Sequence, residues 1–186
     1  IEEIVARAKG DFDKMKAAHP RKEQVSFTAI QGPVTSTILS FITEKNIDLV
    51  VMGTHGTSGW PEFFVGSNTE KIVRMSKVPV LAIRKSFEPS SIKNIVFPTT
   101  LDLNQVHLIN QVKELQLLFA ARLHLLLVNT PYNLRRTIDE MESMEEYAKF
   151  YKLSNYTLNT RNDFHEQDGI INFAHEIKAE MIAMGT

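Results

Sequence analysis

The sequence predicts an α/β protein with doubly wound, mainly parallel sheets in two tandem domains. Segments with apolar residues at every third or fourth position alternate with short apolar segments, the order typical of helices that join parallel strands. The short segment Ile47–Met52 is apolar at every position except Asp48, as expected for a central strand covered on both faces. In addition, Asp48–Thr54 resembles Glu180–Thr186, 132 residues further along (186 − 54), and a repeat of this length indicates tandem domains rather than a solenoid.

The first domain is expected to span residues 1–85. Its predicted elements are a helix over Ile1–Met15, a strand over Val25–Ile30, a helix beginning at Pro33, a strand over Ile47–Met52, a helix over Ser67–Lys77 and a strand over Val78–Ile83. The first helix has an apolar stripe and ends near Pro20, because proline cannot continue it. Val25–Ile30 alternates apolar and polar residues, which is the period of a strand with one wet face. Pro79 cannot donate to a strand ladder, so it places the start of the last strand at an edge or a bulge.

A polar linker, residues 86–91, leads into a second domain over residues 92–186. Its predicted strands are Ile92–Phe97, Arg122–Val128, Tyr156–Asn159 and Met181–Met184, and its predicted helices are Val106–Leu118, Leu134–Tyr151 and Gly169–Ile177. At the repeat offset the strand at Ile92 would correspond to position −40 (92 − 132) of the first domain. We therefore expect the first domain to lack about 40 residues, a strand, a helix and a strand, and the second to lack the counterpart of His55–Lys85.

Composition limits the classes of partner. The net charge of −1 provides no overall field to recruit nucleic acid or an anionic membrane, so we expect neither as a partner. The chain has no cysteine, which excludes disulfides, thiol catalysis and cysteine-ligated metal. The six histidines form no pair four residues apart, and we predict no metal site. No apolar run approaches the roughly 20 residues of a membrane span, no signal peptide is visible, and a cytoplasmic location is expected.

Three glycines carry the chemical prediction, and we call Gly53, Gly56 and Gly66 the glycine set. The first two follow a predicted strand, where doubly wound sheets bind ligands, and they allow close approach and positive φ. Gly66 precedes a helix whose first amides lack internal partners and favour an anion. The following Ser67, Asn68, Thr69 and Glu70 add hydroxyls and amides, and Ser67 with Glu70 also forms the pattern of a capping box. The alternative is that these glycines are only turn residues and Ser67 only a cap; a Walker A loop is excluded, because no Gly-Lys-Ser/Thr follows.

These residues resemble the universal stress proteins. Residues 48–84, DLVVMGTHGTSGWPEFFVGSNTEKIVRMSKVPVLAIR, are similar to the carboxyl-terminal half of that family, and residues 92–100, IKNIVFPTT, resemble its first strand in a second copy. The resemblance implies a Rossmann-like fold of the adenine nucleotide α-hydrolase-like group, and ATP, with Mg²⁺, as the ligand. It also implies a nucleotide site that contains Met52, Gly53, His55, Gly56, Gly66, Ser67, Asn68 and Thr69 in the first domain, and Pro98, Thr99, Thr100 and Val128 in the second.

The sequence departs from the family pattern in three places. Thr100 stands where the first strand of the family usually ends in an aspartate, and Asp102 lies two positions later. Thr57 and residues 60–62 occupy positions that are often basic in relatives. A hydroxyl in place of a carboxylate puts nucleotide binding by the second domain in question, and fewer positive charges would weaken ATP binding.

Three functions therefore remain open. The leading hypothesis is a stress-response module that binds and senses ATP without obligatory turnover. The alternative is a nucleotide-independent regulatory or interaction protein of the same fold, with possible protein partners. In either case the resemblance implies pairing through the strand Val78–Ile83, as a homodimer or between the two domains of one chain. The third is an enzyme such as a weak ATP hydrolase, for which only His55 is suitably placed; no catalytic residue is predicted.

Overall fold

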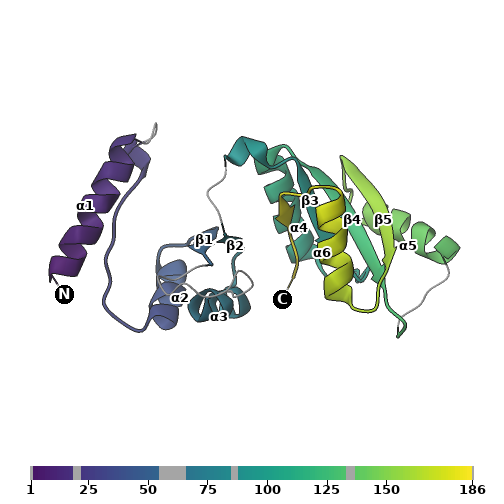
Figure 1. Ribbon diagram of the computed structural model, residues 1–186, viewed down its shortest axis with the longest axis horizontal. Helices are drawn as coiled ribbons and strands as arrows, with labels where there is room; N and C mark the ends of the chain where they lie inside the picture. Colours follow the sequence, from purple (N-terminus) through teal and green to yellow (C-terminus); the bar gives the residue numbers. More distant parts are fainter. Residues whose placement is uncertain (1, 19–21, 55–65, 85–87, 133–136, 186) are drawn as a thin grey trace. The chain divides into compact units, whose positions relative to one another are not determined.

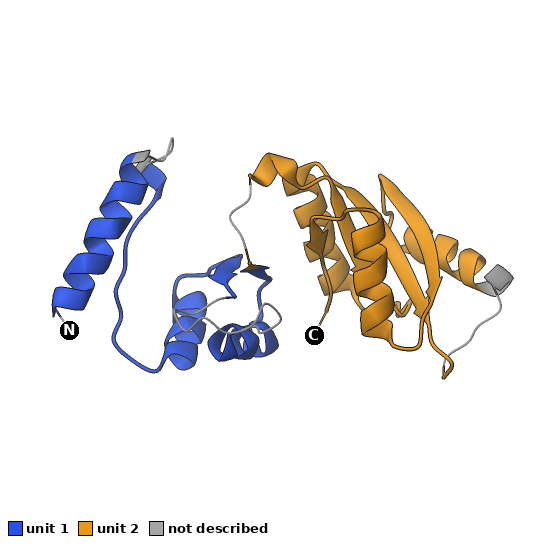
Figure 2. Cartoon of the chain, in the orientation of Figure 1, with its two compact units in different colours: residues 1–82 blue, residues 83–186 orange. Residues whose placement is uncertain are grey.

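A computed structural model describes residues 2–18, 22–54, 66–84, 88–132 and 137–185 (Figure 1). The chain divides into two compact units, Ile1–Ala82 (unit 1) and Ile83–Thr186 (unit 2), which are described separately (Figure 2).

Unit 1 contains three helices and a small sheet within its described residues. Its elements are α1 (Glu2–Ala18), a 3₁₀ turn η1 (Lys22–Gln24), α2 (Val34–Glu44), β1 (Val50–Gly53), α3 (Ser67–Met75) and β2 (Val80–Ile83). All three predicted helices are confirmed, and α2 lies against α3. The strands β1 and β2 form a two-stranded sheet, at whose start the Val50 amide donates to the Pro79 carbonyl at 3.0 Å.

Two expectations for unit 1 are wrong. Residues 25–30 form no strand; the Phe27 ring in this segment instead lies 5.4 Å from the ring of Phe12 in α1. Alternation alone cannot make a strand, because a strand also needs a neighbour to pair with. Nor is β1 covered on both faces: Val51 is 55% exposed, since β1 belongs to a two-stranded sheet and has few elements around it.

Unit 2 contains a four-stranded parallel sheet with helices between its strands. Its elements are η2 (Pro89–Ser91), β3 (Asn94–Pro98), α4 (Val106–Phe119), β4 (Arg122–Asn129), α5 (Thr137–Phe150), β5 (Tyr156–Asn162), α6 (Glu166–Glu176) and β6 (Met181–Ile182). The strand order is β5-β4-β3-β6, and each neighbouring pair is parallel, which confirms the predicted α/β fold. The chain therefore adds strands on one side of β3 and then crosses back to its other side.

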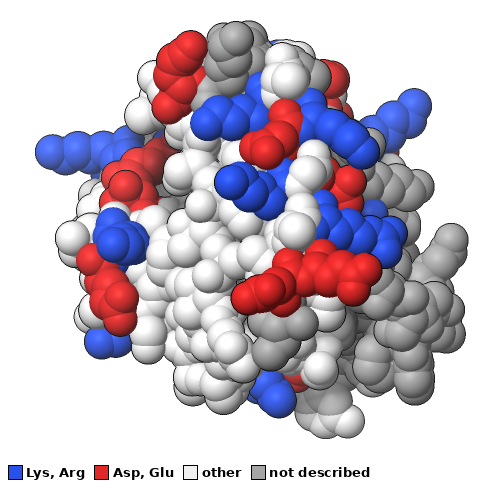
Figure 3. All heavy atoms as spheres, turned by 90° about the vertical axis from the view of Figure 1, so that its left-hand side faces the viewer, with Lys and Arg blue, Asp and Glu red and all other residues white. Residues whose placement is uncertain are grey.

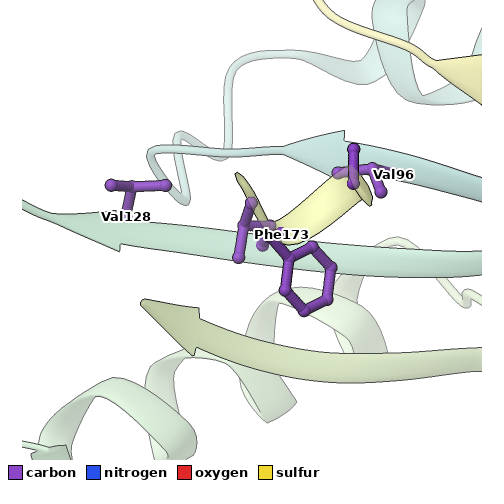
Figure 4. Packing of buried hydrophobic residues seen from close by; sticks show 5 residues of the cluster. Val96, Val128 and Phe173 are labelled. Atoms are coloured by element: carbon purple, nitrogen blue, oxygen red, sulfur yellow. The ribbon is translucent and has the colours of Figure 1, made fainter. Parts of the chain in front are cut away.

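The core of unit 2 lies on both faces of β3 and β4. Alternate residues of these strands point to opposite faces. On one face Val96, Leu126 and Val128 pack against Phe173 and Ala174 of α6 (Figure 4). The opposite face is buried as well, with Ile95, Phe97, Leu123 and Leu125 at most 1% exposed. Figure 1 shows α6 in front of the sheet and α4 and α5 behind it.

The repeat found in the sequence extends to the backbone. Both bounds of α2 and α6 are related by the same offset (166 − 34 = 132 and 176 − 44 = 132). Each helix is followed by a left-handed residue, Asn46 with φ 48° and Lys178 with φ 53°, again 132 positions apart. The next amide closes an equivalent bond in each unit, from Ile47 to the Ile42 carbonyl and from Ala179 to the Ala174 carbonyl. Left-handed residues commonly end helices in this way.

A polar chain crosses three strands of unit 2 through His124. Its Nε2 lies 3.0 Å from the Asn94 amide oxygen, which only accepts, so Nε2 carries the proton. Its Nδ1 then accepts from the Thr157 hydroxyl at 2.7 Å. Burial, and after it the charge of Arg122, lower the pKa of His124 below its ordinary value. The folded structure therefore holds this imidazole neutral.

We expect acidification to destabilise the fold through His124. The unfolded chain takes up a proton at this site near pH 6.5, whereas the folded chain does so only at lower pH. Stability is therefore retained above pH 6.5 and falls as the pH drops from there to the folded pKa. Urea midpoints at pH 7.5 and 5.5 measure the loss, and His124→Gln, which is uncharged at both pH values, should reduce it. An equal loss in this variant would assign the pH dependence to other groups.

We expect Gly169→Ala to be destabilising. A Cβ at Gly169, in the first turn of α6, would lie 2.6 Å from Cγ1 of Val128, which is buried in the core. Overpacking of this kind costs about 1–3 kcal/mol. Gly10→Ala in α1 is the matched control, because no described atom lies within 4 Å of its Cβ position and alanine favours a helix by about 1 kcal/mol. Denaturant unfolding should give changes of opposite sign, and a stabilising Gly169→Ala would contradict the close contact.

Candidate functional site

In unit 1 the end of β1 is tied to the start of α3. The Gly66 amide donates to the Thr54 carbonyl at 3.0 Å, and the Thr69 hydroxyl donates to the Gly53 carbonyl at 3.1 Å. Thr69 is only 3% exposed, so this second bond is shielded from water. The structure thus brings Gly53, Gly66 and Thr69 together, although twelve residues separate the glycines in the sequence.

The first turn of α3 has three backbone amides that make no hydrogen bond within the helix. The first helical bond runs from the Glu70 amide to the Gly66 carbonyl at 3.0 Å, so helix geometry leaves the amides of Ser67, Asn68 and Thr69 without a helical partner. The side chains of Ser67 and Asn68 are exposed. These amides and the helix dipole favour an anion at this end of α3.

Neither of the two described glycines of the set, Gly53 and Gly66, adopts a left-handed backbone conformation. Gly66 has φ −54°, and Gly53 is also outside the positive-φ region. A Cβ at Gly66 would lie 3.3 Å from the Thr54 carbonyl oxygen and would crowd the junction. Within the described part of the chain, no atom lies within 4 Å of a Cβ built at Gly53. The backbone is therefore open to close approach there.

The predicted capping box at Ser67 is wrong. The helix begins one residue earlier than the box requires, with Gly66 as N-cap and no side-chain cap. A box needs its serine at the N-cap and its glutamate three residues later, whereas Ser67 is the first helical residue. Glu70 instead pairs with Arg74 at 3.2 Å. The Ser67 hydroxyl is consequently not used as a cap.

Of the remaining predicted residues of unit 1, the structure describes only some. Met52 lies in β1 and is half-buried. His55 and Gly56 lie outside the described residues, as do Thr57 and residues 60–62. A hollow of about 230 Å³ lies along α2, lined by Ile30, Ser36, Thr37, Ser40, Phe41 and Glu44, and shares no residue with the predicted site.

In unit 2 the predicted residues gather at the carboxyl end of β3. Pro98 ends the strand, and the Thr99 amide donates to the Leu126 carbonyl at 3.0 Å. The Thr99 side chain turns inward, and its hydroxyl accepts from the Leu101 amide at 3.0 Å. Thr100 is exposed. Val128 is buried under α6, so its side chain serves the core (Figure 4).

The strand order shows at which point of the unit 2 sheet a doubly wound fold would bind a ligand. Strand order reverses between β3 and β6, and doubly wound sheets bind ligands outside the carboxyl ends of strands at such a point. The Ala183 amide donates to the Val96 carbonyl at 2.9 Å, which brings the end of β6 beside β3. Gly185 follows, and a Cβ there would lie 2.9 Å from Cδ2 of Leu108. The predicted site omitted Gly185, although its place in the repeat, 132 residues after Gly53, was a usable signal.

The carboxylate of Asp102 does not take the place of the aspartate that relatives usually have at the position of Thr100. Its Oδ1 accepts from the backbone amide of Asn104 at 2.9 Å and from the side-chain amide of the same residue at 3.0 Å. The group is therefore engaged in its own turn. At the end of β3 the exposed residue at position 100 is a threonine, which offers a hydroxyl in place of a carboxylate.

Charge and metal-ligand patterns are unremarkable on the described residues. The face seen in Figure 3 carries acidic and basic side chains side by side, without a large area of one sign. Where the structure describes side chains, no three His, Asp or Glu residues gather as metal ligands. None of the described helices is long and apolar enough to cross a bilayer.

Comparison with known proteins identifies the family. The family model described as "Universal stress protein family" matches residues 2–84, the segment that contains the glycine set. Residues 2–84 thus match the universal stress protein family. A universal stress protein of Methanocaldococcus jannaschii is 34% identical over 56 residues, which are 30% of this chain and 33% of that protein. The universal stress protein YxiE of Bacillus subtilis is 35% identical over 71 residues, 38% of this chain and 47% of its own length. The matches thus span a third to a half of these curated relatives.

The fold likeness extends over both units. The crystal structure of a universal stress protein from Archaeoglobus fulgidus is similar over 100% of this chain and 67% of its own, with a TM-score of 0.73 and 18% identity. A functionally unknown protein from Pseudomonas aeruginosa covers 97% of this chain with a TM-score of 0.67 and 18% identity. At this identity the likeness shows the fold alone.

We expect the Thr69 hydroxyl to hold the junction together. Thr69→Val removes the donor to the Gly53 carbonyl at nearly constant volume, and an unpaired buried acceptor costs about 1–3 kcal/mol. Thr69→Ser retains the hydroxyl and is the control. Hydrogen exchange of the β1 and α3 amides measures the local effect, with faster exchange expected in the valine variant. Equal exchange in both variants would show that the bond contributes nothing.

Proposed function

We propose that the chain is a stress-response module that binds and senses ATP or a related adenine nucleotide. The observation that carries the proposal is the junction in which Gly66 and Thr69 bind the end of β1, and in which the first three amides of α3 have no helical partner. An arrangement of glycines at a strand end followed by a helix start is a common phosphate site. The match of residues 2–84 to the universal stress protein family supports the same assignment.

The phosphates of the nucleotide would bind at the start of α3. The amides of Ser67, Asn68 and Thr69 are the donors, and the absence of side chains at Gly53 and Gly66 allows a phosphate oxygen to approach the backbone. His55 and Gly56 belong to the same proposed site by their place in the sequence. Mg²⁺ would accompany ATP as part of the ligand and lower its charge.

We also propose that the two units are tandem universal stress domains, residues 1–85 and 92–186, joined by the linker 86–91. The common offset of helix bounds, left-handed residues and closing hydrogen bonds supports this interpretation. Pairing through β2, between the domains or between two chains, and a cytoplasmic location belong to the same proposal. A chain without cysteine suits a reducing compartment.

A nucleotide-independent regulatory role is the second candidate, and one observation in unit 2 favours it. Thr100 offers an exposed hydroxyl at the end of β3, and the nearby Asp102 carboxylate is engaged by Asn104. A neutral hydroxyl binds a nucleotide less tightly than a carboxylate does, because a carboxylate accepts stronger hydrogen bonds from the ribose hydroxyls. Unit 2 could then act through protein contacts while unit 1 binds the nucleotide.

A charge reversal at α3 tests the proposed phosphate site. Ser67→Asp places a carboxylate at the exposed helix start, where it should stabilise the helix but repel phosphate. We expect the Kd for Mg·ATP in calorimetry to rise by roughly tenfold or more, because like charges a few ångströms apart repel by over 1 kcal/mol.

The matched control is Ser36→Asp, which adds the same charge to the first turn of α2 in the same unit. It should leave ATP affinity nearly unchanged. If both variants bind Mg·ATP like the unmodified chain, the start of α3 is not the phosphate site. If the unmodified chain does not bind ATP at all, the proposed function is wrong.

A further inference from the structure

Unit 2 has two edge strands, β5 and β6, and they differ in length. Of the strands that the structure describes, β5 pairs with β4 alone and β6 with β3 alone (Figure 1). β6 has two residues, Met181–Ile182, whereas β5 has seven, Tyr156–Asn162, all of them in register with β4. A short edge strand offers little for another chain to pair with, but a long one offers a row of backbone donors and acceptors. The open edge of β5 is therefore the stronger candidate for pairing.

Two hydrogen bonds show which backbone groups of β5 face this open side. The Asn155 carbonyl accepts from the Leu123 amide, and the Asp163 amide donates to the Asn129 carbonyl, both at 3.0 Å. Backbone groups alternate in direction along a strand, so the odd-numbered residues of β5 bond to β4. The amides and carbonyls of the even-numbered residues consequently point away from the sheet. These residues are Tyr156, Leu158, Thr160 and Asn162.

β5 carries few of the features that keep an edge strand from pairing. Its segment YTLNTRN contains no proline, glycine, lysine or acidic residue, and its register with β4 runs without a bulge. The one charged side chain, Arg161, is paired with Glu176 of α6. Natural edge strands are usually protected by proline, lysine or a bulge. The absence of these features from β5 indicates that this edge is covered in the assembled protein.

The open edge is complementary to itself. Two copies related by a two-fold axis bring their edges together antiparallel, with the same residues on both sides. With Leu158 opposite its own copy, Tyr156 lies opposite Thr160, and an aromatic side chain beside a β-branched one is a favourable cross-strand pair. Each such pair of outward-facing residues exchanges two backbone hydrogen bonds. The stretch from Tyr156 to Thr160 is uncharged, so this register places no like charges opposite each other.

Exposed aromatic side chains lie just outside both ends of β5. Phe150, at the end of α5, precedes the strand and is 56% exposed, and Phe164 follows the strand and is 77% exposed. Antiparallel pairing places the start of one strand beside the end of the other. Phe164 of one copy and Phe150 of the other would then lie at the same end of the joined strands, where covering their apolar surface would favour association.

We propose that two copies of this chain associate through antiparallel pairing of their β5 strands. The pairing joins the four-stranded sheets of the two copies into one continuous sheet. Main-chain hydrogen bonds supply the affinity, and the cross-strand pairs fix the register. This interface lies in unit 2 and involves neither β2 nor the glycine set, so it goes beyond the proposed function and is independent of nucleotide binding.

Residue-resolved hydrogen exchange of the unmodified full chain tests the proposal at two concentrations, with the dimer fraction at each measured by sedimentation. In the dimer we expect the amides of Tyr156, Leu158 and Thr160 to exchange roughly tenfold more slowly or better, because each gains a hydrogen-bond partner. The amides of Thr157 and Asn159 are the internal control. They bond to β4 in both states, so their exchange should change far less.

Thr160→Pro tests the pairing directly. It removes an outward-facing donor and leaves the ladder to β4 in place, because the Thr160 amide does not take part in that ladder. Each dimer loses two hydrogen bonds, one from each copy, and we expect the Kd of the dimer to rise roughly tenfold or more. Thr160→Val keeps the amide and the β-branched shape and should dimerise as the unmodified chain does. If Thr160→Pro fails to fold, the exchange pattern of the unmodified chain decides alone.

Three results would overturn the inference. The first is a chain that stays monomeric up to millimolar concentration. The second is a dimer in which the even-numbered amides of β5 exchange as they do in the monomer, which would assign the dimer to another surface. The third is a folded Thr160→Pro variant that dimerises with an unchanged Kd. None of these results bears on ATP binding at α3, which calorimetry tests separately.

Discussion

The position of β3 at the interior of the sheet determines the organisation of unit 2. This strand pairs with β4 on one side and with β6 on the other, and Ile95 and Val96 are fully shielded from solvent. Because β4 and β5 lie on one side only, the chain must cross back over β3 to add β6. The strand order therefore reverses between β3 and β6. The candidate residues from Pro98 to Thr100 are positioned by this one strand end.

Two segments that correspond in the repeat have a similar backbone in the two units but are buried to different extents. The α2–β1 and α6–β6 segments agree in helix bounds and in the left-handed residue that follows the helix. Even so, Val51 is 55% exposed, whereas Ala183, its counterpart at the repeat offset (183 − 132 = 51), is 9% exposed. The difference comes from the surrounding sheet, since the β6 segment adjoins the buried β3 and β1 belongs to a two-stranded sheet. Burial of a strand is thus a property of its neighbours.

This dependence on neighbours separates what could be predicted from the sequence from what could not. Helices were predictable because their apolar stripes are local, and the parallel order followed from the alternation of elements. The strand expected at Val25–Ile30 depended on a pairing that no local pattern reports. The capping box failed because the start of α3 differs by one residue, within the ordinary uncertainty of a helix end.

The groups that the structure describes at the candidate site are hydrogen-bonding groups rather than acids or bases. In unit 1 the proposed contacts are backbone amides of α3, and in unit 2 the groups at the end of β3 are hydroxyls. Amides and unperturbed hydroxyls hold an anion or a base but neither take up nor release a proton near neutral pH, so they cannot act as general acid or base. Groups of this kind can hold an anion or an uncharged ligand by hydrogen bonds alone.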